Sequence, residues 1–190
     1  MEEAGASTQG SMAAVVRGNV DSIIQYCKED SGVVGVANFN SPQQVVISGE
    51  VDAIERVSKR LEQDKVRVIP LSVSGAFHSP LMDSAGVKLA NELETVCFNE
   101  FTTQLVTNVT GEVVADISDI KGLLVNQLTD SVLWEKSIQY MISKGVTTFI
   151  EVGPSNTLAG LIKKIDKSVT VYNINTAQSV NEVASLLEGE

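Results

Sequence analysis

The sequence predicts an α/β protein built in two parts, and three observations carry that prediction. The chain has 190 residues, of which 43% are hydrophobic and 20% charged, as in ordinary globular proteins. Its first part alternates short β-rich runs with amphipathic segments in the order β-α-β-β-α-β. Its second part repeats strand and helix patterns, which favours a parallel sheet. We therefore expect a flexible lead-in over residues 1–10, a small subdomain over residues 11–74 and a partial core over residues 75–190.

The elements of the small subdomain follow one another with short connections. Asn19 is placed to cap the first helix, and Asn40-Ser41-Pro42-Gln43 has the chemistry of a turn between two strands. The expected strands cover residues 12–16, 33–39, 44–47 and 66–73, and the expected helices carry Val20 to Cys27 and Val51 to Leu61. This order is that of a ferredoxin-like split unit, with an unrelated α+β layout as the alternative.

The second part begins with a long amphipathic helix that follows residue 80. Ser118 is expected to cap a later helix, and Gly145 is expected to end the next one. The expected strands cover residues 104–109, 146–152 and 169–174, and the other expected helices begin near Ser118, Trp134, Leu158 and Val180. About three strands are too few for a comfortable doubly wound sheet, so this part is predicted to be an incomplete core.

Charge and composition exclude several classes of partner and site. The formal net charge is −10, which argues against a nucleic-acid partner. No apolar run approaches the length of a membrane span and no signal-peptide pattern is present, so we expect no membrane partner and a cytoplasmic or organelle-matrix location. Cys27 and Cys97 are expected to be reduced, buried thiols. No Cys or His pair has metal-ligand spacing, so no metal is expected. No cofactor is expected either.

His78 is the only histidine, and it lies in the run Gly75-Ala76-Phe77-His78-Ser79-Pro80 between an expected strand and an expected helix. Such loops often carry site residues, and an imidazole suits a general base near neutral pH. The alternative is an ordinary surface or core histidine. No Gly-x-Ser-x-Gly nucleophile elbow occurs in the sequence, and the nearest imitation, Gly153-Pro154-Ser155-Asn156, lacks the second glycine. The pattern therefore predicts a base without its nucleophile.

Five segments together resemble the malonyl-CoA:acyl-carrier-protein transacylase family, in the family's order and with near-family spacing. They are Gly10 to Val15, Ala37 to Pro42 with Gln44 to Gly49, Gly75 to Met82, Val125 to Leu128, and Phe149 to Pro154. The resemblance covers almost the whole chain but only the later part of the family sequence. Met1-Glu2-Glu3-Ala4 resembles the stretch just after the family's carboxylate-binding arginine. We therefore expect a C-terminal fragment, whether recombinant, proteolytic or separately encoded.

The resemblance implies both a fold and a chemistry. Family members have an α/β-hydrolase-like acyltransferase core with an inserted ferredoxin-like subdomain, so residues 75–190 are expected to be the C-terminal part of that core. They transfer a malonyl group from CoA to the phosphopantetheine thiol of acyl carrier protein, through a malonyl-serine, in fatty-acid or polyketide synthesis. The family's serine, arginine and oxyanion-hole glutamine have no counterpart here. We expect a chain that is inactive alone, with malonyl-CoA, acyl carrier protein and the missing N-terminal segment as partners.

Four residues match positions of the family's site. His78 matches the general base, and Gln127 matches the residue whose backbone carbonyl orients the ring; a surface-facing glutamine is the alternative for Gln127. Asn40 matches a residue near the acyl pocket, with plain turn chemistry as its alternative. Phe77 matches the bulky residue associated with malonyl over branched units, with an ordinary core aromatic as its alternative.

A basic stripe, formed by Arg56, Lys59 and Arg60, shares one face of the second expected helix. It can attract CoA phosphates or an acidic carrier protein, and a solvated face interleaved with Glu55 and Glu62 is the alternative. The stripe motivates a second functional hypothesis, in which the chain is a non-catalytic module that docks acyl carrier protein or another partner.

Overall fold

The computed structural model describes residue 5 and residues 8–188, and the chain divides into two compact units, Met1–Ser137 and Ile138–Glu190. The predicted boundary between residues 74 and 75 falls inside the first unit. Most of the predicted lead-in, namely residues 1–4, 6 and 7, lies outside the described residues. The domain boundaries expected from the sequence therefore stay a prediction.

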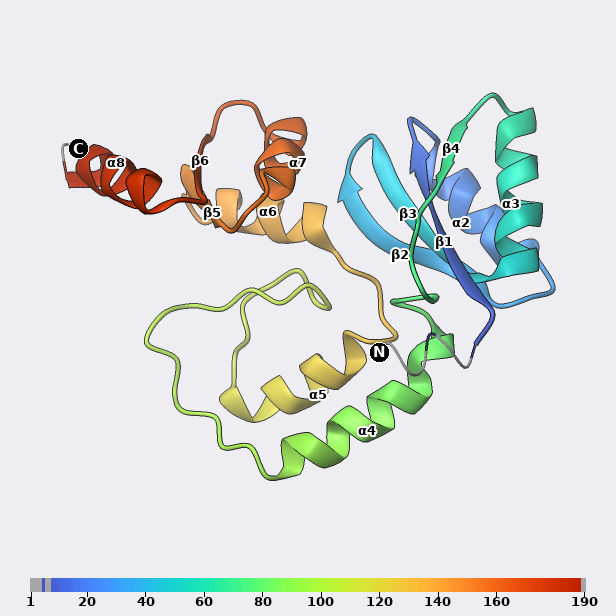
Figure 1. The fold of residues 1–190 in the computed structure, drawn as a ribbon, viewed down its shortest axis with the longest axis horizontal. Coiled ribbons are helices and arrows are strands. Elements are labelled where there is room, and N and C mark those ends of the chain that lie inside the picture. Colours follow the sequence, from blue (N-terminus) through green and yellow to red (C-terminus); the bar gives the residue numbers. More distant parts are fainter. Residues whose placement is uncertain (1–4, 6–7, 189–190) are drawn as a thin grey trace. The chain divides into compact units, whose positions relative to one another are not determined.

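Within the described residues, the first unit contains an antiparallel four-stranded sheet with the strand order β2-β3-β1-β4 (Figure 1). Its strands are β1 (Gly10–Val16), β2 (Val34–Ser41), β3 (Gln44–Glu50) and β4 (Arg67–Pro70). Helix α2 (Val20–Glu29) follows β1 and helix α3 (Val51–Gln63) follows β3, so the predicted order of elements is confirmed. Asn19 caps α2 as predicted, because its Oδ1 accepts from the backbone N–H of Ser22 at 2.9 Å.

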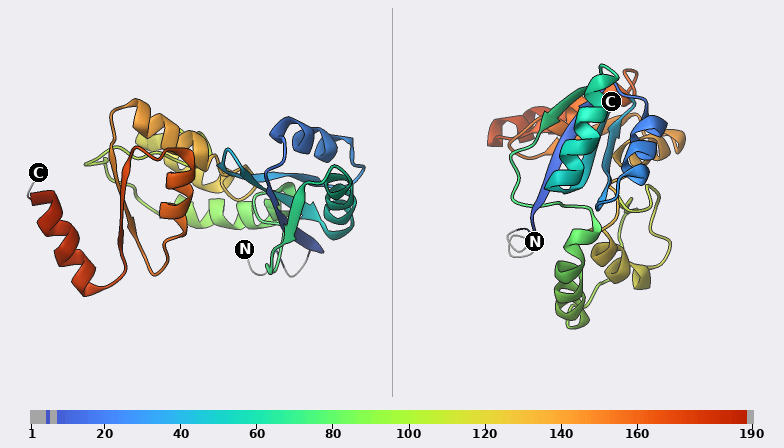
Figure 2. Two further views of the ribbon diagram at one scale, coloured as in Figure 1. Left: turned by 90° about the horizontal axis from the view of Figure 1, so that it is seen from above. Right: turned by 90° about the vertical axis from the view of Figure 1, so that its right-hand side faces the viewer.

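Alternate residues of each strand face opposite sides of this sheet. Ala13 and Val15 pack against α2 and α3, which lie on the same face (Figures 1 and 2). The buried cluster on this face comprises Ala13, Val15, Ile23, Cys27, Val45, Ile47, Ile54, Val57 and Leu61. On the other face, Phe77 and Leu71 pack against Met12, Ala14, Ala37 and Val46. The opposite face therefore anchors the loop that carries His78.

The rest of the first unit is helical, with long connections. A 3-10 turn, η1 (Pro80–Met82), leads into α4 (Asp83–Glu94), and η2 (Ile117–Asp119) leads into α5 (Ile120–Asn126). Helix α4 lies beside α5 (Figures 1 and 2). Helix α6 (Trp134–Ser143) begins in this unit and continues into the second.

Two expectations for this region were wrong. Residues 104–109 form no strand, and the described backbone shows only one antiparallel bridge there, between Val106 and Val113. A strand needs a neighbouring strand along its length. Here the run folds back on itself and is paired at one position, so no strand forms. Ser118 does not cap α5, because Asp116 two positions earlier accepts from the Ser118 backbone N–H at 2.8 Å and starts the 3-10 turn instead.

The second unit contains a parallel pair of strands, as the alternation of elements predicts. Strand β5 (Thr148–Val152) pairs with β6 (Thr170–Ile174), and α7 (Thr157–Ile165) connects them before α8 (Ala177–Glu188) ends the described chain. Gly145 ends α6 as predicted, with a φ of +92° and its N–H donating to the Ile142 carbonyl at 2.9 Å. The whole chain is a mixed α/β protein.

The cysteines differ from each other in environment. Cys27 is buried as predicted, and desolvation, together with the nearby Asp30 charge, raises the pKa of its thiol to about 11. The prediction for Cys97 was wrong, because this residue is exposed beyond the end of α4. No described helix is long and apolar enough to cross a membrane.

Candidate active site

His78 lies in the turn between β4 and η1 with a φ of +57°, a left-handed conformation that is uncommon for residues with a Cβ. Such a conformation persists only when its surroundings fix it. Ser79, which is 3% exposed, supplies part of that support. Its Oγ donates to the Ala76 carbonyl at 2.6 Å and accepts from the Leu81 N–H at 3.3 Å, which caps η1.

The end of α5 holds the imidazole ring of His78. Helix α5 ends at Asn126, so the Gln127 carbonyl lies past the helix's own hydrogen-bond ladder and is open to an outside donor. Its oxygen lies 2.7 Å from His78 Nδ1, and the His78 backbone N–H donates to the Leu128 carbonyl at 3.1 Å. Two contacts therefore join the turn of His78 to the end of α5.

These contacts set the tautomer of the neutral ring. A backbone carbonyl can only accept, so Nδ1 carries the proton and Nε2 keeps a free lone pair. The side-chain Nε2 of Gln127 also lies 3.4 Å from Nδ1. An amide N–H would donate to an unprotonated Nδ1, whereas the carbonyl accepts from a protonated one. The carbonyl contact is the shorter of the two, so we assign the proton to Nδ1. A ring in this state can accept a proton at Nε2.

A cavity of about 660 Å³ adjoins His78, which is within the usual size range of small-molecule sites. Three segments supply most of its wall: the chain entering β2, the turn of His78, and the residues after α5. The lining residues are Gly32, Val33, Val34, Gly35, Val36, His78, Ser79, Pro80, Val109, Thr129, Asp130, Ser131 and Leu133. His78 is the only histidine of the chain, so it is the only imidazole that can serve a group bound in this cavity.

The residues after α5 are fastened to the edge of the sheet. The Val132 N–H donates to the Ala37 carbonyl at 2.7 Å, and the Phe39 N–H donates to the Val132 carbonyl at 2.9 Å. Ser131 Oγ donates to the Val36 carbonyl at 2.6 Å. One short segment therefore supplies both the carbonyl that holds His78 and a wall of the cavity.

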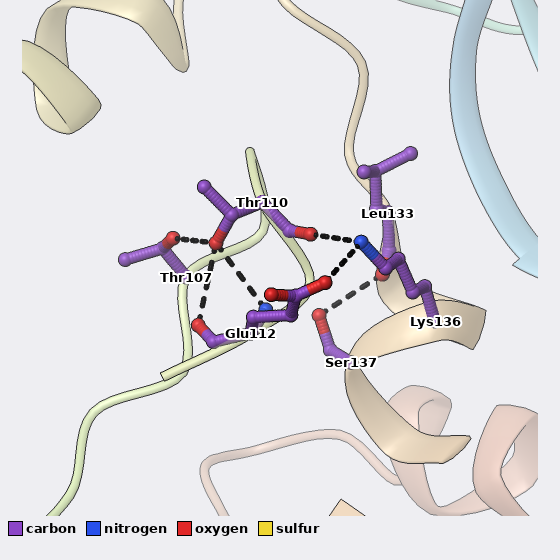
Figure 3. Close-up of polar contacts among 6 residues, drawn as sticks. All are labelled: Thr107, Thr110, Glu112, Leu133, Lys136 and Ser137. Atoms are coloured by element: carbon purple, nitrogen blue, oxygen red, sulfur yellow. Dashed lines mark hydrogen bonds and ion pairs between the residues drawn. The ribbon is translucent and has the colours of Figure 1, made fainter. Parts of the chain in front are cut away.

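Figure 3 shows how the hairpin around Thr110 is attached to the start of α6. Lys136 Nζ donates to the Thr110 carbonyl at 2.8 Å and pairs with the Glu112 carboxylate at 2.7 Å (Figure 3). The pKa of Glu112 is lowered because Lys136 donates a hydrogen bond to it and attracts its charge. Val109 in this hairpin and Leu133 next to α6 both line the cavity, so the attachment fixes part of its wall.

Neither Phe77 nor Asn40 is among the described residues that line this cavity. Phe77 packs between the helical cluster that includes Met82 and the sheet cluster that includes Met12. Asn40 lies four residues past Val36 on β2, about 13 Å along an extended strand. Their substrate-binding roles stay predictions.

The basic stripe of Arg56, Lys59 and Arg60 lies on α3, and none of the three is among the described residues that line the cavity. Arg60 pairs with Glu29 at 2.5 Å and stacks on the Tyr26 ring at 3.9 Å. Arg56 pairs with Asp30 at 2.6 Å. The two arginines therefore form ion pairs with Glu29 of α2 and with Asp30, the C-cap residue of that helix. The docking role of the stripe stays a prediction.

Sequence reasoning missed most of the cavity wall and the support of the turn. Residues 32–36 and 129–133 carry no chemical motif, and only tertiary structure brings them to His78. Ser79 did carry a signal, because a serine directly before proline is a typical start of a helical turn.

The chain is similar to proteins of one known family. The acyl transferase domain family matches residues 2–185. Malonyl CoA-acyl carrier protein transacylase of Bacillus subtilis is 34% identical over 194 residues, covering 100% of this chain and 61% of that protein. The Escherichia coli protein of the same name is 39% identical, covering 92% of this chain and 58% of that protein. The chain therefore spans less than two thirds of the length of these relatives.

Solved structures give the same result. The crystal structure of malonyl CoA-acyl carrier protein transacylase from Clostridium perfringens is 38% identical, with a TM-score of 0.94, and the match covers 100% of this chain and 60% of that one. A malonyl-transacylase solved in complex with a type II PKS acyl-carrier protein is 31% identical, with a TM-score of 0.90, over 96% of this chain and 62% of that one.

Proposed function

Because this chain belongs to the acyl transferase domain family, we propose that it supplies the histidine half of a malonyl-CoA:acyl-carrier-protein transacylase site. The observation that carries the proposal is the 2.7 Å contact between His78 Nδ1 and the Gln127 carbonyl, beside a cavity. It leaves Nε2 free to take a proton, which is what a nucleophilic hydroxyl requires of its base.

The proposed chemistry is a two-step acyl transfer. A serine on the family's N-terminal segment attacks the thioester carbon of malonyl-CoA while His78 Nε2 takes the hydroxyl proton. When the C–S bond breaks, the imidazolium returns that proton to the CoA thiolate, leaving a malonyl-serine ester. The phosphopantetheine thiol of acyl carrier protein then gives its proton to Nε2 and attacks the ester. The imidazolium finally protonates the released serine oxygen.

The surroundings of His78 suit both steps. The Gln127 carbonyl carries a partial negative charge, so it stabilises the imidazolium that forms in each step, as a carboxylate does in other triads. We expect Phe77 to restrict the space beside the acyl group and Asn40 to lie near the acyl pocket of the complete enzyme. The chemistry needs no resident cofactor, since malonyl-CoA is consumed as substrate.

We assign the β-α-β-β-α-β unit to the family's ferredoxin-like subdomain and the remainder to part of its α/β-hydrolase-like core. In the second unit, Ile150 of β5 is 40% exposed and Val152 is 76% exposed. A parallel sheet is normally buried on both faces, so these side chains mark a surface that further core structure would cover. We propose that the N-terminal segment supplies it, together with the serine.

Reconstitution tests the proposal. The chain is mixed with the N-terminal part of the Clostridium perfringens relative, assembly is verified by native mass spectrometry, and malonyl transfer from malonyl-CoA to holo acyl carrier protein is measured by intact mass. The expected result is no transfer by the chain alone and transfer by the assembled pair. His78→Ala should slow transfer at least about 100-fold, while the exposed turn variant Gln43→Ala should not.

Two results would contradict the proposal. A stoichiometric malonyl adduct on the isolated chain would show that the nucleophile lies within it. Transfer by the assembled His78→Ala pair at the wild-type rate would show that His78 is not the base.

A further inference from the structure

The cavity wall made by residues 32–36 begins as a connection between α2 and β2, which starts at Val34. The first two residues of this wall, Gly32 and Val33, lie before the start of β2 and therefore outside its ladder of strand hydrogen bonds. Their positions must therefore come from contacts with side chains and backbone on other elements.

Asp30, the C-cap residue of α2, makes the first of these contacts. Its Oδ1 accepts from the Gly32 backbone N–H at 2.8 Å. The same carboxylate is held by Arg56 of α3, whose Nη2 and Nε donate to it at 2.6 and 2.9 Å. The Asp30 side chain is 9% exposed and the Arg56 side chain 49%, so this is a two-point ion pair with a shielded carboxylate and a half-exposed guanidinium.

Glu50 and close packing hold the same segment from the other side. Glu50 Oε2 accepts from the Val33 N–H at 3.1 Å, and the Glu50 N–H donates to the Val33 carbonyl at 2.8 Å. A Cβ at Gly32 would lie 2.6 Å from Glu50 Oε2 and 3.1 Å from Arg56 Nη2, so a larger residue would displace one of these side chains.

We propose that Arg56 is a positioning residue: through Asp30 it holds Gly32, and with it the first residues of the cavity wall, in place beside His78. The inference rests on the proposed function only for the ligand, malonyl-CoA. It gives Arg56 a role different from the docking of phosphates or of an acidic carrier protein.

The two roles make opposite demands on the side chain. A cation that attracts phosphates or an acidic partner over a distance acts through its charge, so lysine would keep most of that attraction. Holding Asp30, a contact we call the clamp, needs the planar guanidinium group that reaches both carboxylate oxygens. Lysine should therefore not replace arginine in this role. Arg56→Lys therefore separates the two roles, and Asp30→Asn tests the clamp from its other end. Lys28→Met, which removes an exposed charge from α2, is the matched control.

Hydrogen exchange of the isolated chain measures the clamp directly. In Arg56→Lys and Asp30→Asn, the amides of Gly32 and Val33 should exchange about tenfold or more faster than in the wild type, whereas those of β1 and β3 should not change. Lys28→Met should match the wild type throughout. Unchanged exchange at Gly32 and Val33 in both variants would overturn the proposal, and so would an equal rise across the whole sheet.

Malonyl-CoA binding, followed at the His78 ring signal, gives the second readout. Weaker binding in Arg56→Lys and Asp30→Asn, roughly tenfold, is expected if the wall contacts the ligand. Undiminished binding in Arg56→Lys, together with loosened amides, would show that the clamped wall does not serve this ligand. If the wild type does not bind malonyl-CoA, the ligand assignment fails, and the exchange experiment still decides whether the clamp exists.

Discussion

Ser79→Ala probes how the turn that carries His78 is held. The substitution removes the bond to the Ala76 carbonyl at 2.6 Å and the cap on the Leu81 N–H at 3.3 Å, both made by an Oγ in a residue that is 3% exposed. A net hydrogen bond contributes about 0.5–1.5 kcal/mol, and loss of a serine cap costs about 0.5–2 kcal/mol. We therefore expect a loss of about 2 kcal/mol, or roughly a 30-fold fall in the ratio of folded to unfolded protein.

The assay is urea unfolding followed at the imidazole proton signals of His78. This histidine is the only one in the chain, and it lies in the first unit, so its signals report the unit that contains the substitution. Ser22→Ala is the matched control, since Ser22 is an exposed residue in the same unit whose Oγ donates to the Asn19 side chain at 3.2 Å. The control should change stability by less than about 0.5 kcal/mol. A loss that small in Ser79→Ala would refute the reasoning.

Three further predictions concern charge, thiols and backbone. The Arg56 hydrogen bonds lower the pKa of Asp30 below its ordinary 3.8, so the stability that Asp30 contributes is present above that pH and is lost as the pH falls through the folded-state pKa. The unfolding curves of the wild type and Asp30→Asn should therefore converge in acid. A stability difference that persists in acid would contradict this. Exposed Cys97 should react with a disulfide reagent at neutral pH, and buried Cys27 should react only after unfolding. Rapid reaction of both thiols in the native protein would contradict this. Gly111→Ala should lower the free energy of unfolding by about 1 kcal/mol or more, because its φ is +67° and a Cβ would lie 2.7 Å from the Lys136 side chain; an unchanged urea midpoint would contradict it.

Much of the first unit could be predicted from local sequence patterns. The apolar positions of α2 and α3 recur at helical spacing, Asn19 is a direct signal for a cap, and β1 and β3 are short apolar runs. Residues 104–109 show the limit of this method. Their composition is that of a strand, but pairing depends on a neighbour that local composition does not reveal.

The candidate site could be predicted only in part, because its contacts join distant positions. His78 stands out as a lone histidine in a turn, but its partner Gln127 lies 49 residues away and was found by family resemblance. Asp30 and Arg56 lie 26 residues apart, and the sequence showed Arg56 only as one member of a basic helix face. The shielded Asp30 carboxylate and the two-point contact, which change the interpretation of Arg56, exist only in the folded chain.

The tautomer of the His78 ring tests most directly whether this chain holds a base ready to accept a proton. The measurement is a long-range ¹⁵N–¹H spectrum of the isolated chain, recorded on the neutral form of the ring. The contact with the Gln127 carbonyl predicts one set of signals, with the proton on Nδ1 and an unprotonated Nε2. A ring protonated on Nε2, or a mixture like that of a free imidazole, would contradict the assignment of His78 as the base.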